Sequence, residues 1–105
     1  DEDAFSKKIY DVIGAGVGII ESVPAAVSIA YYTQDPNKCC LMCANLGGDT
    51  DTIGAMATAI CGAFVGYSKI NSEYTELLRV QNPETDFEEY INILEKGREL
   101  LGCGR

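Results

Sequence analysis

The sequence predicts an all-α fold, a segment of a helical bundle, and three observations carry this prediction. Small residues recur at intervals of four from Gly54 to Gly66, a spacing that places them on one face of a helix. Apolar side chains between Phe87 and Leu101 form a stripe of helical period, with acidic residues opposite. The pairs Asp35-Pro36 and Asn82-Pro83 mark helix boundaries, because proline fits a first helical turn and disfavours helix in the residue before it.

The first third of the chain is expected to contain two helices joined by a glycine-rich loop. An amphipathic segment runs from Ala4 to Ile13, and three glycines break its periodicity between Gly14 and Gly18. We expect Pro24 to begin the next helix, whose first apolar turns extend from Ala25 to Tyr32.

Two further helices are expected in the middle of the chain. Asp35 is placed to cap a helix that Pro36 begins and that runs to about Asn45. The next helix is expected from Thr50 to about Tyr67. Small side chains let another backbone approach closely, so we expect its face of small residues to pack inside the protein and to hold the preceding loop on a rigid element. This face consists of Gly54, Thr58, Gly62 and Gly66, with Ala55, Ala59 and Ala63 beside it.

The last part of the chain is expected to contain two amphipathic helices. Asn71 or Ser72 is placed to cap a short helix that ends at Arg79. The final helix is expected from about Glu84 to Leu101, with Asp86 as the alternative cap. The acidic residues at its start are typical of a first helical turn, and we assign them no chemistry.

Composition and charge limit the class of protein. A chain of 105 residues with 47% hydrophobic residues matches one soluble domain, of a size that is only marginally stable by buried area alone. Its net charge of −8 argues against nucleic acid as a partner, because eight scattered basic residues form no stripe. The apolar run that follows Thr52 is slightly too short for a membrane span and begins beside carboxylates, so we expect no membrane partner.

Five cysteines and no histidine favour reduced thiols and a cytoplasmic protein, since the count is odd and no signal peptide precedes them. Cys39 and Cys43 are four residues apart and share a helix face, so a soft-metal pair is one interpretation. No second pair follows at zinc-finger spacing, and the alternative is that the thiols are small buried hydrophobic groups. The full set is Cys39, Cys40, Cys43, Cys61 and Cys103.

The run from Gly47 to Thr52, with the sequence Gly-Gly-Asp-Thr-Asp-Thr, contains the ligand types of a hard-cation site. Residues two apart do not face each other on a regular helix. Asp49 and Asp51 can therefore bind one ion only if Asp49 lies in the irregular turn before the helix, or they bracket two neighbouring ions. Helix capping by the same residues is the alternative, and the local spacing does not decide between them.

The glycine-rich segment Gly14–Gly18 also has two interpretations. Bare backbone lets a nucleoside approach closely, and Val17 offers an apolar surface to its base. A flexible connector is the alternative, because glycine-rich turns are common. A Rossmann fingerprint does not fit, because its third glycine would fall at Ile19 and no βαβ pattern surrounds it.

Two motifs in this order resemble the ADP-ribosylglycohydrolase family. The stretch Asn45–Gly66 is similar to the C-terminal signature of that family, and Gly14–Ala26 is similar to the segment that lies beside the ribose and adenine of ADP-ribose. The amino-acid sequences of both motifs resemble the branch of the family that removes ADP-ribose from serine and cleaves related O-linked ADP-ribose. Family members are roughly three times as long, so residues 1–105 resemble the C-terminal part of one all-helical domain whose N-terminal part is absent.

The resemblance implies a magnesium-dependent hydrolase, with manganese as the alternative ion. It assigns Asp49, Asp51 and Thr52 as metal ligands of a two-metal site, and Gly16–Gly18, including Val17, as contacts to the nucleoside. We expect the absent N-terminal portion to supply further metal ligands and the carboxylate that transfers protons. That portion is therefore an expected partner of this chain. ADP-ribose, or a protein that carries it, is the expected substrate. A non-enzymatic relative, crystallin-like or only ADP-ribose-binding, is the alternative.

Overall fold

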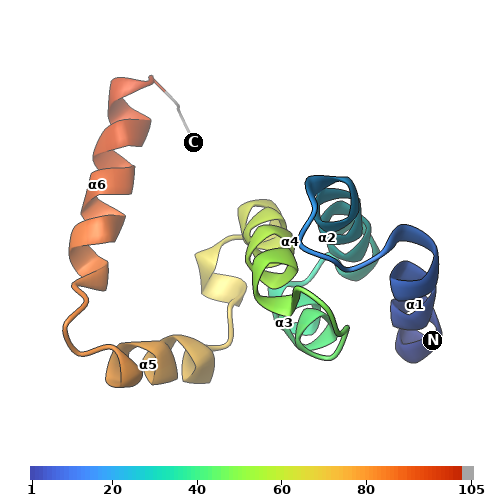
Figure 1. Cartoon of the computed structure of the whole chain (residues 1–105). Coiled ribbons are helices and arrows are strands. Elements are labelled where there is room, and N and C mark those ends of the chain that lie inside the picture. The colour runs from blue at the N-terminus through green and yellow to red at the C-terminus, as the bar shows by residue number, and fades with distance from the viewer. Residues whose placement is uncertain (103–105) are drawn as a thin grey trace. The chain divides into compact units, whose positions relative to one another are not determined.

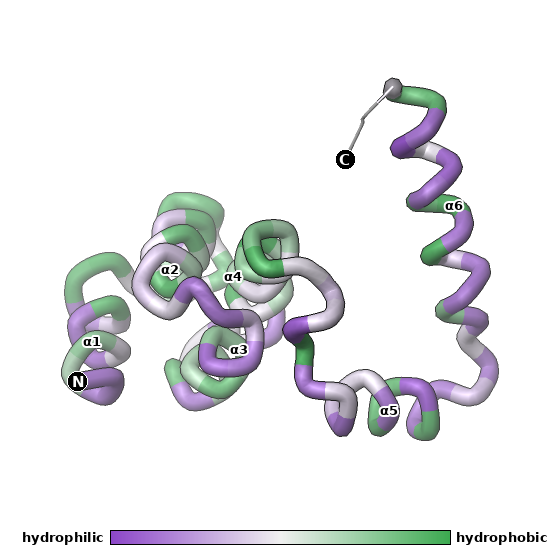
Figure 2. The backbone as a smooth tube through the Cα atoms, turned by 180° about the vertical axis from the view of Figure 1, so that it is seen from behind, coloured by the Kyte–Doolittle hydropathy of each residue, from purple (hydrophilic) through white to green (hydrophobic). Residues whose placement is uncertain are grey.

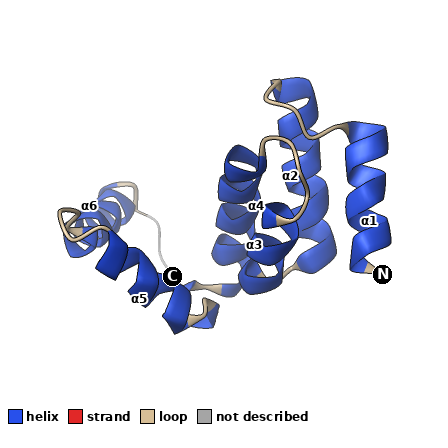
Figure 3. Cartoon of the chain, turned by 60° about the horizontal axis from the view of Figure 1, so that its bottom comes forward, coloured by secondary structure: helices blue, strands red, loops and turns tan. Residues whose placement is uncertain are grey.

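The structure, a computed structural model, describes residues 1–102, and Cys103 and Gly104 lie outside this range. All regular elements in the described residues are helical (Figure 3), which confirms the all-α prediction. Two compact units divide the chain, the first Asp1–Asn71 and the second from Ser72 onward. The helices are α1 Glu2–Lys8, the π-helical turn Ile9–Ile13, α2 Ile19–Thr33, α3 Pro36–Ala44, α4 Thr50–Val65, the 3-10 turn Tyr67–Lys69, α5 Ser72–Gln81 and α6 Phe87–Leu100.

Helices α2, α3 and α4 pack together in the first unit (Figure 1). The backbone N–H of Asp49, just before α4, donates to the carbonyl of Ala15, just before α2, at 2.7 Å. Toward the other end, the Cys61 thiol of α4 lies 3.6 Å from the carbonyl of Ala30 in α2. The two helices therefore run parallel, and both begin at the same end of the unit.

The core of the first unit is built from small side chains, which explains how these helices approach closely. Ala25 and Ala26 of α2 and Ala57 of α4 are each at most 1% exposed. Ile29 and Ile53 are fully buried and supply the largest apolar volume of the core. Hydrophobic residues line much of α2 and α4, as Figure 2 shows in green.

Two local contacts attach the ends of the first unit to this core. The rings of Phe5 in α1 and Tyr32 in α2 stack with centroids 4.0 Å apart. At the other end of the unit, the Asn37 side chain of α3 donates to the Lys69 carbonyl at 2.8 Å and accepts from the Asn71 N–H at 2.7 Å. The segment after α4 is therefore fastened to the start of α3.

The predicted start of α2 was wrong, because the helix begins at Ile19 and not at Pro24. Gly18 adopts an extended conformation as the N-cap, and its carbonyl accepts from Glu21 and Ser22. Pro24 lies within the helix, where it removes one backbone hydrogen bond. Burial of the α2 residues that follow it offsets that loss.

The other predicted boundaries lie close to the observed ones. Asp35 caps α3, and its side chain accepts from the Asn37 N–H at 2.9 Å. Helix α4 ends at Val65, two residues before the predicted end, because Gly66 has a φ of 91°. At that angle the chain leaves the helix.

The small-residue face of α4 is only partly buried, so that prediction holds at one position and fails at another. A Cβ on Gly54 would lie 3.4 Å from the Cys43 side chain, which shows close helix packing there. A Cβ on Gly62 would meet nothing within 4 Å. The fully buried residues of α4 are Ile53, Ala57 and Cys61, one position away from the predicted face.

The second unit contains α5 and α6, neither of which has a buried residue. Asp86 caps α6 and accepts from the Glu89 N–H at 3.0 Å, so the alternative cap is the observed one. Hydrophobic and hydrophilic residues alternate along α6 (Figure 2). Its apolar stripe is exposed within this unit, with Leu94 at 73%. Within residues 1–102, every helix is too short or too polar to cross a bilayer.

Candidate functional site

The candidate site begins with the loop before α4, where two consecutive glycines adopt conformations that other residues rarely use. Gly47 has a φ of 88° and Gly48 a φ of 74°. This turn places Asp49 at the N-cap of α4, but the Asp49 side chain makes no capping hydrogen bond. The Asp49 carboxylate is therefore not used to cap the helix.

Asp51 lies in the first turn of α4 beside Asp49. Its Oδ1 accepts a hydrogen bond from the Thr52 N–H at 2.9 Å. A side-chain hydrogen bond with Asp49 is the largest cause that lowers the pKa of Asp51, followed by the backbone N–H of Thr52. Asp51 is exposed and fully charged at neutral pH, as a ligand for a hard cation must be.

The structure joins this loop to the glycine-rich loop that precedes α2. The Asp49 N–H donates to the Ala15 carbonyl at 2.7 Å. A Cβ on Gly48 would lie only 2.2 Å from the same carbonyl oxygen. Glycine at position 48 is thus required both by its φ and by the close approach of the two loops. The two sequence motifs, distant along the chain, form one surface.

The glycine-rich loop presents open backbone and apolar side chains beside the Asp49 loop. A Cβ on Gly18 would meet nothing within 4 Å. Val17, Ile19 and Ile20 are between 78% and 86% exposed. Sequence reasoning identified Val17 but missed the two isoleucines, because it placed them before the helix. Together these residues offer exposed apolar side chains next to accessible backbone.

Glu21 is a further residue that sequence reasoning missed. A Cβ on Gly14 would lie 1.9 Å from the Glu21 Oε1 position, and a Cβ on Gly16 would lie 2.5 Å from Oε2. Gly14 and Gly16 therefore make room for this carboxylate. With Gly18 as N-cap, Glu21 occupies the third helical position, from which a glutamate often turns back toward the preceding loop.

Because α2 and α4 run parallel, the loops that precede them both lie at the N-terminal end of a helix. The N-terminal end of a helix carries a partial positive charge and free N–H groups. Both helices begin at this surface, and the N-cap of α2 is a glycine without a side chain. Phosphate oxygens are favoured at such ends, which counteracts part of the repulsion from the acidic loop.

Asp49, Asp51 and the Thr52 hydroxyl supply oxygen ligands of the type that magnesium binds. Within residues 1–102, however, no group of three or more histidine, cysteine or acidic side chains is placed to hold a metal ion. These residues fit a hard cation, and the remaining ligands must come from water, substrate or another portion of the protein.

No group of three or more cysteine, histidine or acidic side chains able to hold a metal occurs in the part of the chain that the structure describes. Cys39, Cys43 and Cys61 are buried free thiols, whereas Cys40 is exposed. A hydrogen bond with Cys43, and then burial, raise the pKa of Cys39, and the same contact lowers that of Cys43. Burial is the main cause that raises the pKa of Cys61. These three thiols are packed core groups, while Cys103 lies outside the described residues.

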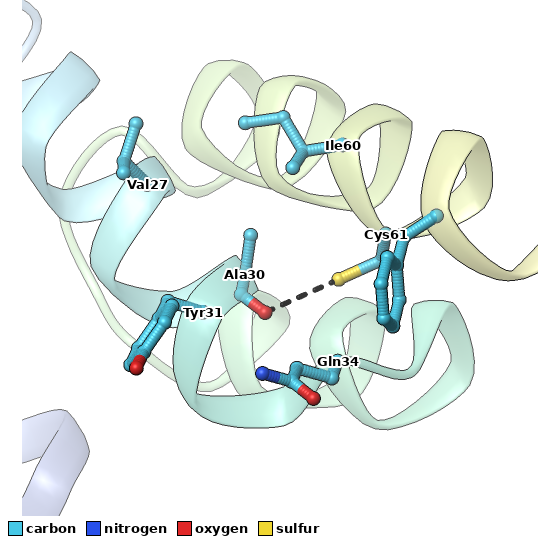
Figure 4. Close-up of a pocket in the computed structure, with 7 residues that line it drawn as sticks. Val27, Ala30, Tyr31, Gln34, Ile60 and Cys61 are labelled. Carbon is cyan, nitrogen blue, oxygen red and sulfur yellow. Dashed lines mark hydrogen bonds between the residues drawn. The ribbon is translucent and has the colours of Figure 1, made fainter.

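Hollows in the first unit include an apolar groove and a polar hollow, neither of which is lined by Asp49 or Asp51. An apolar groove between α2 and α4 is lined by Val27, Tyr31 and Ile60 among others (Figure 4). It lies at the end of these helices where Cys61 meets Ala30, away from the Asp49 loop. A polar hollow beside Gly47 is lined by Asp3, Ser6, Lys7, Tyr10, Asp11, Asn45, Leu46 and Gly47.

This chain belongs to the ADP-ribosylglycohydrolase family, whose model matches residues 1–101. It is 49% identical over 98 residues to the uncharacterized protein YegU of Escherichia coli, covering 92% of this chain and 29% of that protein. Mouse ADP-ribosylhydrolase ARH3 is 30% identical over 88 residues, covering 72% of this chain and 24% of that enzyme.

A further relative is ADP-ribosylarginine hydrolase Tri1 of Serratia proteamaculans, 30% identical over 96 residues, which cover 79% of this chain and 26% of that enzyme. The chain thus spans less than a third of the length of these relatives. No solved structure matches it significantly.

Proposed function

We propose that this chain forms part of a magnesium-dependent enzyme that hydrolyses the glycosidic bond between ADP-ribose and a protein side chain, or a related O-linked ADP-ribose. The observation that carries this proposal is the Asp49–Ala15 hydrogen bond, which joins the carboxylate loop to the glycine-rich loop. A metal and a nucleoside bound at adjacent loops would place the ribose between them. Family membership supports the same reaction class.

The proposal gives each of these residues a role. Asp49 and Asp51 would bind the metal through their carboxylates, and Thr52 through its hydroxyl. Magnesium, or manganese in its place, would hold the ribose hydroxyls and orient a water molecule. The loop Gly16–Gly18 would receive the nucleoside, with the base against Val17 and the exposed isoleucines of α2. The pyrophosphate would lie near the first turns of α2 and α4.

A portion of the protein outside this chain would complete the site. Asp49 and Asp51 are the two carboxylates that the described loop offers, and the chain spans at most 29% of the relatives named above. We therefore assign the remaining metal ligands and the general acid or base to an N-terminal portion. The free thiols at four described positions are in accord with a cytoplasmic enzyme.

A binding module without turnover is the competing function, and the incomplete ligand set favours it for this chain in isolation. The two functions differ in one measurable property. An enzyme releases free ADP-ribose from an ADP-ribosylated peptide, whereas a binding module or a crystallin-like relative does not.

The test is hydrolysis of ADP-ribosylated peptides by the longer protein that the proposal requires. Asp49→Ala and Asp51→Ala should each lower kcat/KM by roughly 100-fold or more, because a lost metal ligand removes several kcal/mol of stabilisation. Glu95→Gln is the matched control, since Glu95 is an exposed carboxylate that pairs with Arg98 in α6. Activity that survives both aspartate substitutions would exclude the proposed metal site.

A further inference from the structure

The Glu21 carboxylate lies directly against the glycine-rich loop, in a way that the proposed reaction does not require. Its two oxygens occupy the space where side chains at positions 14 and 16 would begin, at 1.9 Å and 2.5 Å from the ideal Cβ positions. The side chain is half-buried and comes from the first turn of α2. Gly14 and Gly16 are thus spaced to receive the two oxygens of one carboxylate.

The segment that Glu21 contacts also carries the links to the rest of the site. Ala15 lies between the two glycines, is 5% exposed, and accepts from the Asp49 N–H. Val17 follows directly, with its side chain exposed. Any displacement of this segment therefore moves the carbonyl that fixes Asp49 and the apolar surface offered to the base.

We propose that Glu21 is a positioning residue that holds the Gly14–Gly18 loop against the Asp49 loop. Its side chain packs against Gly14 and Gly16 and supports the loop from the α2 side, and the Ala15 carbonyl carries this position to the Asp49 N–H. The consequence for ligand binding rests on the proposed function. The contact of Glu21 with Gly14 and Gly16, called the clasp below, does not depend on the proposed function and is measurable without any ligand.

A purely local helix-capping role is the alternative for Glu21. Loss of a first-turn acidic residue at an exposed helix end weakens that helix as a whole. It would not selectively open a hydrogen bond at the start of α4. Amide exchange at Asp49 therefore separates the two roles.

The experiment measures hydrogen exchange of the Asp49 amide in the whole chain, relative to the core amide of Ala57 in the same helix. Glu21→Ala should increase this relative exchange at least tenfold, and Glu21→Gln, which keeps the shape of the side chain, should increase it less. Glu88→Ala is the matched control, because Glu88 is a first-turn glutamate of α6. It should leave the ratio unchanged. Equal ratios in wild type and Glu21→Ala would overturn the proposal.

A second variant approaches the same contact from the other side and covers the case in which Glu21→Ala fails to fold. Gly16→Ala should displace the carboxylate, since its Cβ would overlap Oε2, and should raise Asp49 exchange as Glu21→Ala does. The double variant should show less than the sum of both effects, because each removes the same contact. Additive effects would mean that the two positions act independently and would contradict the clasp.

Titration of ADP-ribose with magnesium then links the clasp to function. Glu21→Ala should weaken binding about tenfold, with partial rescue by Glu21→Gln. Wild-type binding that Glu21→Ala leaves unchanged would overturn the positioning role alone. Failure of the longer wild-type protein, with its N-terminal portion, to bind ADP-ribose would refute the proposed function, while the exchange ratio still decides whether Glu21 positions the loop.

Discussion

At the scale of single residues, the backbone N–H of Asp49 joins two loops, whereas its side chain takes no part in that contact or in capping. Its N–H is bonded to Ala15, and its carboxylate makes no capping hydrogen bond. The adjacent Gly48 permits this, because its positive φ and missing side chain let the Ala15 carbonyl approach. Asp49, a residue type that commonly caps helices, thus joins the loop before α4 to the loop before α2 through its backbone N–H.

Replacing Gly48 by alanine should disrupt this junction. The substitution forces a φ of 74° on a residue with a Cβ and drives that Cβ against the Ala15 carbonyl. We expect a loss of more than about 1–2 kcal/mol in the free energy of unfolding, the usual penalty of the left-handed conformation alone. Urea denaturation measures it.

Gly62→Ala is the matched control for that substitution. Gly62 is within α4, and its added Cβ would meet nothing within 4 Å. Alanine should stabilise the protein there by about 0.5–1 kcal/mol, because glycine weakens a helix interior. Equal effects at positions 48 and 62 would contradict the role assigned to the close approach.

The buried thiols predict how stability depends on pH. Burial raises the pKa of Cys61, so the folded protein holds this proton more tightly than the unfolded chain does. Its contribution is fully present below the unfolded pKa, roughly 8.5, and is lost as pH rises through the folded pKa. The free energy of unfolding should therefore fall above about pH 8.5.

Urea midpoints between neutral and alkaline pH test this dependence. Cys61→Ala should flatten the alkaline decline, whereas Cys40→Ala, at an exposed thiol, should not. An unchanged alkaline slope in Cys61→Ala would show that this thiol is not the group responsible.

At the scale of elements, local signals predicted most of the helices. The predicted starts of α3 at Pro36 and of α4 at Thr50 are confirmed, and an aspartate is the N-cap residue of each helix. The start of α2 was missed, since its cap is a glycine and Pro24 suggested a later start. The Ala15–Asp49 contact and the seat of Glu21 could not be predicted from spacing, because both depend on how α2 and α4 pack.

Stability should be concentrated in the helices around Ile53. This side chain is fully buried in α4, so Ile53→Ala should cost about 2–5 kcal/mol. Leu94→Ala in α6 should change the free energy of unfolding by less than about 0.5 kcal/mol, because Leu94 is 73% exposed. Thermal unfolding of both variants measures the difference, and similar costs would contradict this distribution.

At the scale of the whole molecule, the negative net charge of the chain means that the proposed binding of ADP-ribose depends on a metal ion. The chain carries a net charge of −8, and ADP-ribose is an anion through its pyrophosphate. The positive ends of α2 and α4 are only partial charges and cannot alone reverse the sign at Asp49 and Asp51. A divalent cation bound there would reverse the sign of the local charge, so ADP-ribose binding should require the cation.

The measurement that tests this account most directly is calorimetric titration of ADP-ribose into the protein, with magnesium and with a chelator. We predict binding that requires magnesium and that Asp49→Ala and Asp51→Ala each abolish. ADP-ribose binding that is equal without magnesium, or that persists in both variants, would contradict the claim that these carboxylates hold the metal beside the nucleoside loop.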